Sequence, residues 1–262
     1  MTEYVILQKI YGPRRQRCAQ TLLQELRSSA SGLEVEISLA GQTERGWARI
    51  DVRGSDEVVA CNHLRQRFGI APRAIEDLKS RSLVMGQAIE AGKVGYGLYV
   101  DVGFAQTPYV DALIPLHTLR SQIADGTKAS THTILETYCI VDNFPLTLRV
   151  NRVDQTGKIE AEFSDRQISI FERWFEDGLD RVLAFGIPKK DIDEALTATQ
   201  LKRDVVKVEQ LGLFEHALLC KLGTEGVGVI ARLGNSLRGI PLHAFSPIKA
   251  RALSGSPKIT QN

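Results

Sequence analysis

The chain has 262 residues, of which 43% are hydrophobic and 24% charged, and its formal net charge is +2. This length predicts about two domains, or three small ones, and it can bury a sizeable core without disulfides or metals. A near-neutral charge does not by itself indicate a nucleic-acid partner. No apolar run approaches the ~20 residues of a membrane span, so we expect no membrane partner.

The charges are unevenly distributed along the chain. Residues 81–165 carry 7 Lys or Arg against 10 Asp or Glu, whereas the residues from Lys221 onward carry six basic side chains and only one acid. Basic character therefore lies at the two ends, where it forms either a solvated surface or a patch that contacts nucleic acid. The candidate basic patch comprises Arg14, Arg15, Arg17, Lys221, Arg232 and Arg238.

The four cysteines are scattered, and none belongs to a CxxC pair. Neither a zinc knuckle nor a redox pair is therefore indicated, and we expect no metal and no cofactor. Free cysteines without a signal peptide indicate a reducing, cytoplasmic location.

The first 78 residues read as a small α+β domain. Alternating apolar residues predict strands, and the spacing of Cys18, Leu22 and Leu26 predicts the apolar face of a helix. The predicted order is strand 4–11, helix 14–28, strand 33–39, strand 47–53 and a helix ending at Phe68.

Residues 79–165 contain several short strands separated by turns, which is typical of a small barrel. We predict strands over 84–89, 97–102, 112–116, 138–141, 146–153 and 159–163. The polar stretch 121–133 reads as a loop or a short helix.

Residues 166–252 read as two helices followed by a small β domain. Ser164 or Asp165 begins a helix that we expect to continue to Phe185, and a second helix spans 189–199. Further predicted strands cover 205–208, 217–222 and 226–233, the last two joined by a Gly-rich hairpin turn. We expect residues 253–262 to form a disordered tail. The predicted fold class is α+β, with a central five-stranded barrel and a C-terminal helical hairpin.

The most informative motif is YGLYVDVG over 96–103, which places Tyr96 and Tyr99 beside glycines on a short strand. A β surface with spaced aromatic residues can stack nucleic-acid bases. Three positions apart on a regular strand, the two tyrosines would face opposite sides unless a bulge at Gly97 redirects one of them.

Four sequence blocks between Met85 and Ser164 resemble the S-one RNA-binding domain, an OB-fold barrel. They are GQAI at 86–89, the tyrosine motif at 96–103, ALIPLHTL at 112–119, and LRVNRVD at 148–154 followed by the strand from Lys158 to Ser164. Ala112 and His117 stand where that family usually has Gly and Ser. The whole chain also resembles an uncharacterised archaeal protein family of the same three-part layout. By layout alone, it is similar to translation initiation factor two alpha and the exosome cap subunits.

The resemblance implies an RNA-binding face on the barrel. The residues that match this face by their position in the motifs are Tyr96, Tyr99, Lys93, His117, Arg149 and Arg152. The tyrosines would stack bases, whereas Lys93 and the arginines would contact phosphate. The structural alternative is that these residues pack or lie on a solvated rim, and His117 alone reads more readily as structural.

We therefore predict a non-catalytic RNA-binding protein, associated with the ribosome or another ribonucleoprotein machine. The sequence has no Ser/His/Asp elbow, HExxH or Walker motif, so we do not expect an enzyme. Two alternatives remain open: a protein–protein adaptor that uses the barrel to dock on ribosomal or RNA-processing proteins, and a subunit of an RNA-processing enzyme.

Overall fold

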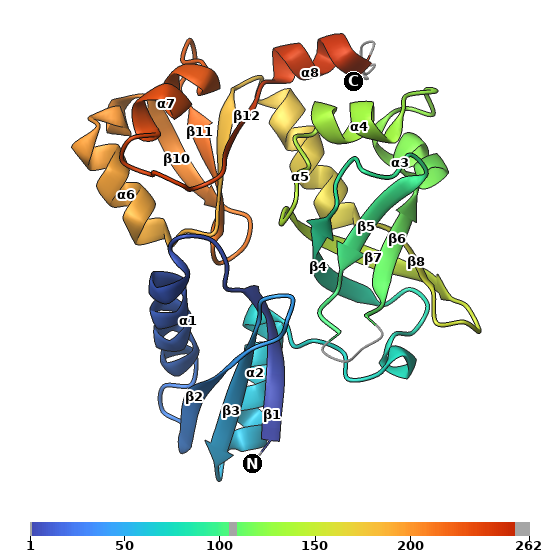
Figure 1. Ribbon diagram of the computed structural model, residues 1–262, viewed down its shortest axis with the longest axis vertical. Helices are drawn as coiled ribbons and strands as arrows, with labels where there is room; N and C mark the ends of the chain where they lie inside the picture. Colours follow the sequence, from blue (N-terminus) through green and yellow to red (C-terminus); the bar gives the residue numbers. More distant parts are fainter. Residues whose placement is uncertain (1, 105–108, 255–262) are drawn as a thin grey trace.

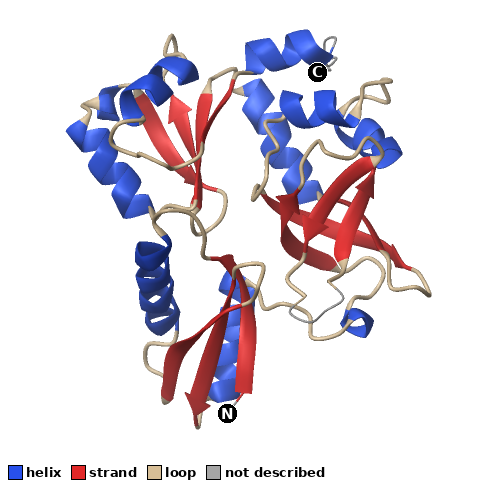
Figure 2. Ribbon diagram, viewed as in Figure 1, coloured by secondary structure: helices blue, strands red, loops and turns tan. Residues whose placement is uncertain are grey.

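The computed structural model describes residues 2–104 and 109–254 and divides into three parts (Figure 1). An N-terminal domain lies at one end of the molecule. The central barrel and a C-terminal sheet lie side by side at the other end. Helices pack against every sheet, so the protein is α+β, as predicted (Figure 2).

The N-terminal domain has the predicted order of strands and helices. Its elements are β1 (Thr2–Lys9), α1 (Arg15–Ser29), β2 (Val35–Gln42), β3 (Trp47–Gly54) and α2 (Glu57–Phe68). The strands form an antiparallel sheet in the order β1-β3-β2. Apolar residues at alternate positions, such as Ile50 and Val52, pack against Leu22 of α1 and Leu64 of α2. Both helices therefore cover one face of the sheet.

The central domain is a closed five-stranded barrel. Its elements are β4 (Leu83–Ile89), β5 (Gly97–Asp101), β6 (Asp111–Pro115), α3 (Leu116–Ile123), α4 (Thr131–Thr137), β7 (Pro145–Val153) and β8 (Ile159–Phe163), preceded by a short 3-10 helix η1 (Ile75–Asp77). The strand order is β4-β5-β6-β8-β7, the order of an OB-type barrel. The fifth and sixth strands of the sequence therefore lie next to each other, and β7 neighbours neither of them.

One predicted strand of the barrel is wrong. Residues 138–141 do not form a strand, because Tyr138 ends α4 and Cys139 has a positive φ of 53°. The apolar side chains of this segment pack into the barrel core from the end of a helix, which a run of apolar residues alone does not distinguish from a strand.

The C-terminal part is built as β-α-β-β-α-β. Its elements are β9 (Arg181–Phe185), α6 (Lys189–Ala198), η2 (Leu201–Arg203), β10 (Val205–Gln210), β11 (Glu215–Cys220), α7 (Gly226–Leu233) and β12 (Leu242–Phe245), followed by α8 (Pro247–Ser254). The antiparallel order β10-β11-β9-β12 is that of a ferredoxin-like sheet. The expected tail at 253–262 falls largely outside the described residues.

Two predictions for this region are wrong: the helix expected to continue to Phe185 and the strand expected at 226–233. The predicted helical hairpin does not form, because β9 lies between the two helices. The helix from residue 165, α5 (Asp165–Glu176), ends before Gly178, whose φ is +66°, and residues 181–185 form the central strand β9. Residues 226–233 form a helix, with Val229 and Leu233 buried at helical spacing. Short apolar runs fit either period, and here the packing decides.

Helix α5 lies between the barrel and the C-terminal sheet and packs against both. Phe171 and Trp174 pack against Phe144 of the barrel on one side, and Trp174 lies 5.2 Å from the ring of Phe245 of β12 on the other. Leu183 and Phe185 of β9 belong to the same core. On the opposite face of β9, Val182 and Ala184 pack beneath α6 and α7. Both faces of this sheet are therefore covered.

A buried ion pair joins the N-terminal domain to the barrel. Lys9 Nζ lies 2.9 Å from Asp101 Oδ2, and the indole Nε1 of Trp47 donates a hydrogen bond of 2.9 Å to the same carboxylate. Asp101 is 1% exposed and Lys9 5% exposed. Arg45 approaches Asp101 from the β2–β3 loop at 3.7 Å. Burial removes water from these charges, so each of them depends on its partner.

A buried carboxylate connects all three parts. Glu215 of β11 accepts hydrogen bonds from Tyr11 Oη at 2.8 Å and from Gln87 Nε2 of the barrel at 3.1 Å. Burial raises the pKa of Glu215 to about 7. The neighbouring His216 is buried on the opposite side of the strand, where burial lowers its pKa to about 4.

In the described part of the chain, none of the helices combines the length and apolar character that a membrane span requires.

Asp101→Asn should lower the free energy of unfolding by about 3 kcal/mol, because it leaves the buried Lys9 ammonium without a counter-charge. Asp193→Asn breaks an exposed ion pair with Lys189 and should cost less than about 1 kcal/mol. Urea denaturation of both variants measures the difference. Equal losses would contradict a special role for the buried pair.

Glu215 should make the protein less stable as the pH rises. Its pKa is higher in the folded chain than the ordinary 4.5, so its stabilising contribution is complete below pH 4.5 and is lost as the pH approaches 7. Over this window the loss amounts to about 3 kcal/mol. Glu215→Gln should remove the decline between pH 5 and pH 8. Because both proteins contain His216, the difference between their pH profiles isolates Glu215, and parallel profiles would refute the assignment.

Candidate nucleic-acid interface

The two tyrosines of the 96–103 motif lie together on the outer surface of the barrel. Their hydroxyl oxygens are 2.9 Å apart and share a hydrogen bond, and their ring centroids lie 6.1 Å apart in a T-shaped arrangement. The hydrogen bond and partial burial raise the pKa of Tyr99. Tyr96 is 56% exposed and Tyr99 is half-buried.

The two tyrosines lie on the same side, although a regular strand would place them on opposite sides, because Tyr96 precedes the first residue of β5 and does not follow its alternation. Gly97 holds the strand close to β6: a Cβ atom there would lie 2.4 Å from the carbonyl oxygen of Ile114. Only glycine permits this approach, which fixes the position of Tyr96 at the edge of the barrel.

An apolar strip surrounds Tyr99. In the barrel register, Tyr99 lies opposite Ile89 of β4 on one side and Leu113 of β6 on the other, and both are half-buried. The backbone amide of Leu116 donates to the Tyr96 carbonyl at 2.8 Å, and the exposed His117 is the next residue along the chain. The structure thus brings Tyr96, Tyr99 and His117 to one region.

Arg149 and Arg152 lie on β7, which does not neighbour β5 in the barrel. Arg149 is 2.5 Å from Asp165 and 3.6 Å from Glu162, and Arg152 is 3.1 Å from Glu160. These two arginines form ion pairs away from the tyrosines.

Lys93 lies in the turn before Tyr96 and forms an exposed ion pair of 3.1 Å with Glu90. Lys93 therefore remains near the tyrosines, although an acid neutralises part of its charge.

The candidate basic patch is divided between two places. Arg17 and Arg14 both approach Asp191 of α6, at 2.7 and 3.8 Å, and so connect the N-terminal and C-terminal domains. A Cβ atom at Gly239 would lie 3.5 Å from Pro13, so the chain next to the exposed Arg238 approaches the turn before α1, and the exposed Arg15 is the first residue of that helix.

The other two members of the patch lie apart from this group. The Lys221 amide donates to the Asp204 carbonyl at 2.8 Å, which places Lys221 beside Asp204. Arg232 forms an ion pair of 2.8 Å with Asp204.

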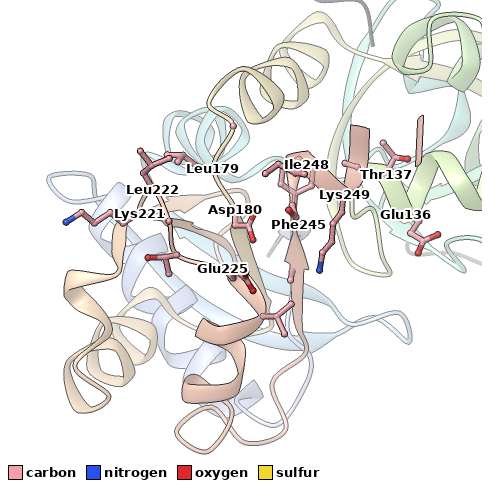
Figure 3. Close-up of a pocket in the computed structure, with 17 residues that line it drawn as sticks. Glu136, Thr137, Leu179, Asp180, Lys221, Leu222, Glu225, Phe245, Ile248 and Lys249 are labelled. Carbon is pink, nitrogen blue, oxygen red and sulfur yellow. The ribbon is translucent and has the colours of Figure 1, made fainter. Parts of the chain in front are cut away.

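The predicted hairpin turn at 223–228 is instead a strand-to-helix connection, and it lines a pocket of about 730 Å³ between α4, α8 and the C-terminal sheet (Figure 3). Such a Gly-rich loop before a helix often holds phosphate. Here the Asp180 carboxylate already accepts a hydrogen bond of 2.9 Å from the Gly226 amide at the helix start. This acid occupies the place of an anion, so the loop is not a phosphate site.

Sequence reasoning missed two residues beside the tyrosine surface, Arg45 and Tyr109. Arg45 Cζ lies 4.4 Å from the centre of the Tyr109 ring, although the residues belong to different domains. No local spacing links them, so only the docking of the domains reveals the pair. Across the described ranges no cluster of three metal-ligating side chains occurs.

These features define a three-domain α+β protein organised around an OB-type barrel. The models of one family match its three parts in order: the DUF2110 N-terminal domain at residues 3–74, the DUF2110 central domain at 79–175 and the DUF2110 C-terminal domain at 179–243. The chain belongs to the DUF2110 family. The central match extends through α5 as far as Phe175, in agreement with the packing of that helix on the barrel.

No curated protein matches the chain in sequence. Among solved structures, the chain is similar to a protein from vaccinia virus (Wisconsin strain), at 19% identity and a TM-score of 0.22. This match covers 33% of this chain and 89% of the viral chain. A TM-score this low carries no structural inference.

Asp180→Ala should lower the free energy of unfolding by about 1 kcal/mol, because the first amide of α7 loses its acceptor. Asp180→Asn keeps an acceptor oxygen and should cost less. Urea denaturation compares the two variants. A gain of inorganic phosphate binding by Asp180→Ala, measured by calorimetry, would show that the loop is a latent anion site.

Proposed function

We propose that this protein is a non-catalytic binder of single-stranded or irregular RNA, and that Tyr96 and Tyr99 stack on its bases. The observation that carries the proposal is the pair of tyrosines at the second strand of an OB-type barrel, with Tyr96 exposed just before the strand and Tyr99 half-buried on it. Oligonucleotides commonly bind OB barrels at this strand and its neighbour. The resemblance of residues 85–164 to the S-one RNA-binding domain supports the same surface.

The cations around this surface are paired with acids, which suggests that contacts to bases contribute more to the affinity than contacts to phosphates. Lys93 is paired with Glu90, and the arginines of β7 are paired elsewhere on the barrel. Few phosphate contacts give a shallow dependence of affinity on salt. Stacking contributes about 1–3 kcal/mol per base, so two tyrosines alone support weak binding.

Additional phosphate contacts are available at the junction of α1 with the C-terminal domain. Arg14 and Arg17 share the single carboxylate of Asp191, and Arg15 and Arg238 are exposed. We propose that this group strengthens binding to longer RNA within a ribonucleoprotein particle.

A second candidate function is a protein adaptor, favoured by the acidic balance of the barrel and its paired arginines. An acidic barrel would dock on a basic partner such as a ribosomal protein. Co-sedimentation with ribosomal particles that survives nuclease digestion, together with no affinity for isolated RNA, would favour this candidate over RNA binding.

Tyr99→Ala should weaken binding of short unstructured RNA by about five- to tenfold, the loss of one stacked base. Fluorescence anisotropy at low salt measures the affinity. Tyr99→Phe keeps the ring and should bind nearly as well as the unaltered protein. Arg149→Ala is a matched control, because its charge is already neutralised by Glu162 and Asp165. Identical affinities for Tyr99→Ala and the unaltered protein would count against the tyrosine surface.

A further inference from the structure

The N-terminal domain extends onto the outer surface of the barrel next to the tyrosines. Arg45 lies in the β2–β3 loop, between Gln42 and Trp47, and its side chain crosses to β6. Its guanidinium pairs with Asp111 through both terminal nitrogens, one of them 3.1 Å from Oδ2. The same group lies over the Tyr109 ring, at 4.4 Å from Cζ to the ring centre.

The strand register places this pair on the face that carries Tyr99. Tyr99 lies opposite Leu113, and Asp101 lies opposite Asp111. Since side chains alternate along a strand, Leu113 and Asp111 point to the same side of β6. Tyr109 lies over the guanidinium that holds Asp111, so its ring belongs to this side too. Along an extended chain, Leu113 and Tyr109 are about 13 Å apart.

The Arg45–Tyr109 pair is held firmly yet remains partly open. The Arg45 side chain is 27% exposed, and two carboxylates fix its position, Asp111 and the buried Asp101. The Tyr109 hydroxyl donates to Glu44 at 2.5 Å, in the same β2–β3 loop. These protein contacts hold the guanidinium and the ring in place, so their positions do not depend on a ligand.

We propose that Arg45 and Tyr109 form a second stacking platform, so that a single-stranded nucleic acid of more than a few nucleotides contacts both the barrel and the N-terminal domain. Bases stack on arginine planes as well as on aromatic rings. This inference rests on the proposed function, because the first platform is Tyr96 and Tyr99. It adds that the complete binding surface exists only when the two domains are docked.

The charge around the second platform determines how the strand is oriented. Lys9 and Arg45 are balanced by Asp101 and Asp111. Arg49, a further cation near Tyr109, is paired with Glu3 at 3.5 Å, and Glu44 adds a negative charge. Phosphates are therefore not attracted to this point, whereas flat bases are compatible with it. The strand would turn its bases toward the platform and its backbone toward solvent.

The test compares oligocytidylates of three and ten nucleotides by fluorescence anisotropy, with the full chain. Tyr109→Ala should weaken binding of the ten-nucleotide strand about tenfold and leave the three-nucleotide strand unchanged. Tyr109→Phe keeps the ring and should bind both strands like the unaltered protein. Arg45→Lys keeps a positive charge near Asp111 but loses the planar group, and it should weaken only the longer strand. If Tyr109→Ala fails to fold, the Arg45→Lys variant tests the proposal on its own.

The outcomes separate this inference from the proposed function. If Tyr99→Ala weakens both strands while Tyr109→Ala and Arg45→Lys bind the longer strand normally, the second platform is refuted and the first stands. If the unaltered protein binds neither strand, both are refuted. A loss confined to the longer strand in Tyr109→Ala and Arg45→Lys supports the platform.

Discussion

The buried carboxylate of Asp101 is the constraint on which the arrangement of the molecule depends. It lies on a barrel strand, but its partners, Lys9 and Trp47, come from the N-terminal domain. Docking buries this carboxylate to 1% exposure, and a buried charge left unpaired carries a large cost, so the domains can dock only with Lys9 and Trp47 placed on Asp101. Glu215 extends this requirement to the C-terminal sheet through Tyr11 and Gln87.

This constraint also decides which part of the barrel surface remains available. The outer positions of β4 and β5 alternate between covered and open: Gln87 and Asp101 are buried by the neighbouring domains, whereas Ile89 and Tyr99 are only half-buried. The open region therefore begins where the domain contacts end. The ferredoxin-like sheet offers no comparable surface, because α5 covers the face that RNA-recognition sheets of this topology use for stacking.

The local patterns of the sequence predicted the N-terminal domain and the barrel well, because their strands alternate clearly and their turns carry glycine. The pattern failed at 138–141, 181–185 and 226–233, where short apolar runs fit both a helix and a strand and tertiary packing decides. Of the candidate site, the sequence located Tyr96, Tyr99 and His117. It could not predict that Arg149 would be neutralised by Glu162 and Asp165, nor that Arg45 would reach Tyr109, because these contacts depend on the fold as a whole.

The position of α5 between the barrel and the C-terminal sheet has a consequence for folding during synthesis. If the C-terminal sheet folded without this helix, Leu183, Phe185 and Phe245 would be exposed together. They would form an apolar patch that is prone to aggregation. The barrel and α5 precede the sheet in the chain, so α5 is synthesised before the sheet whose apolar face it covers. The order of the segments therefore shields the nascent sheet from aggregation, and a circular permutation that placed the sheet first would remove this protection.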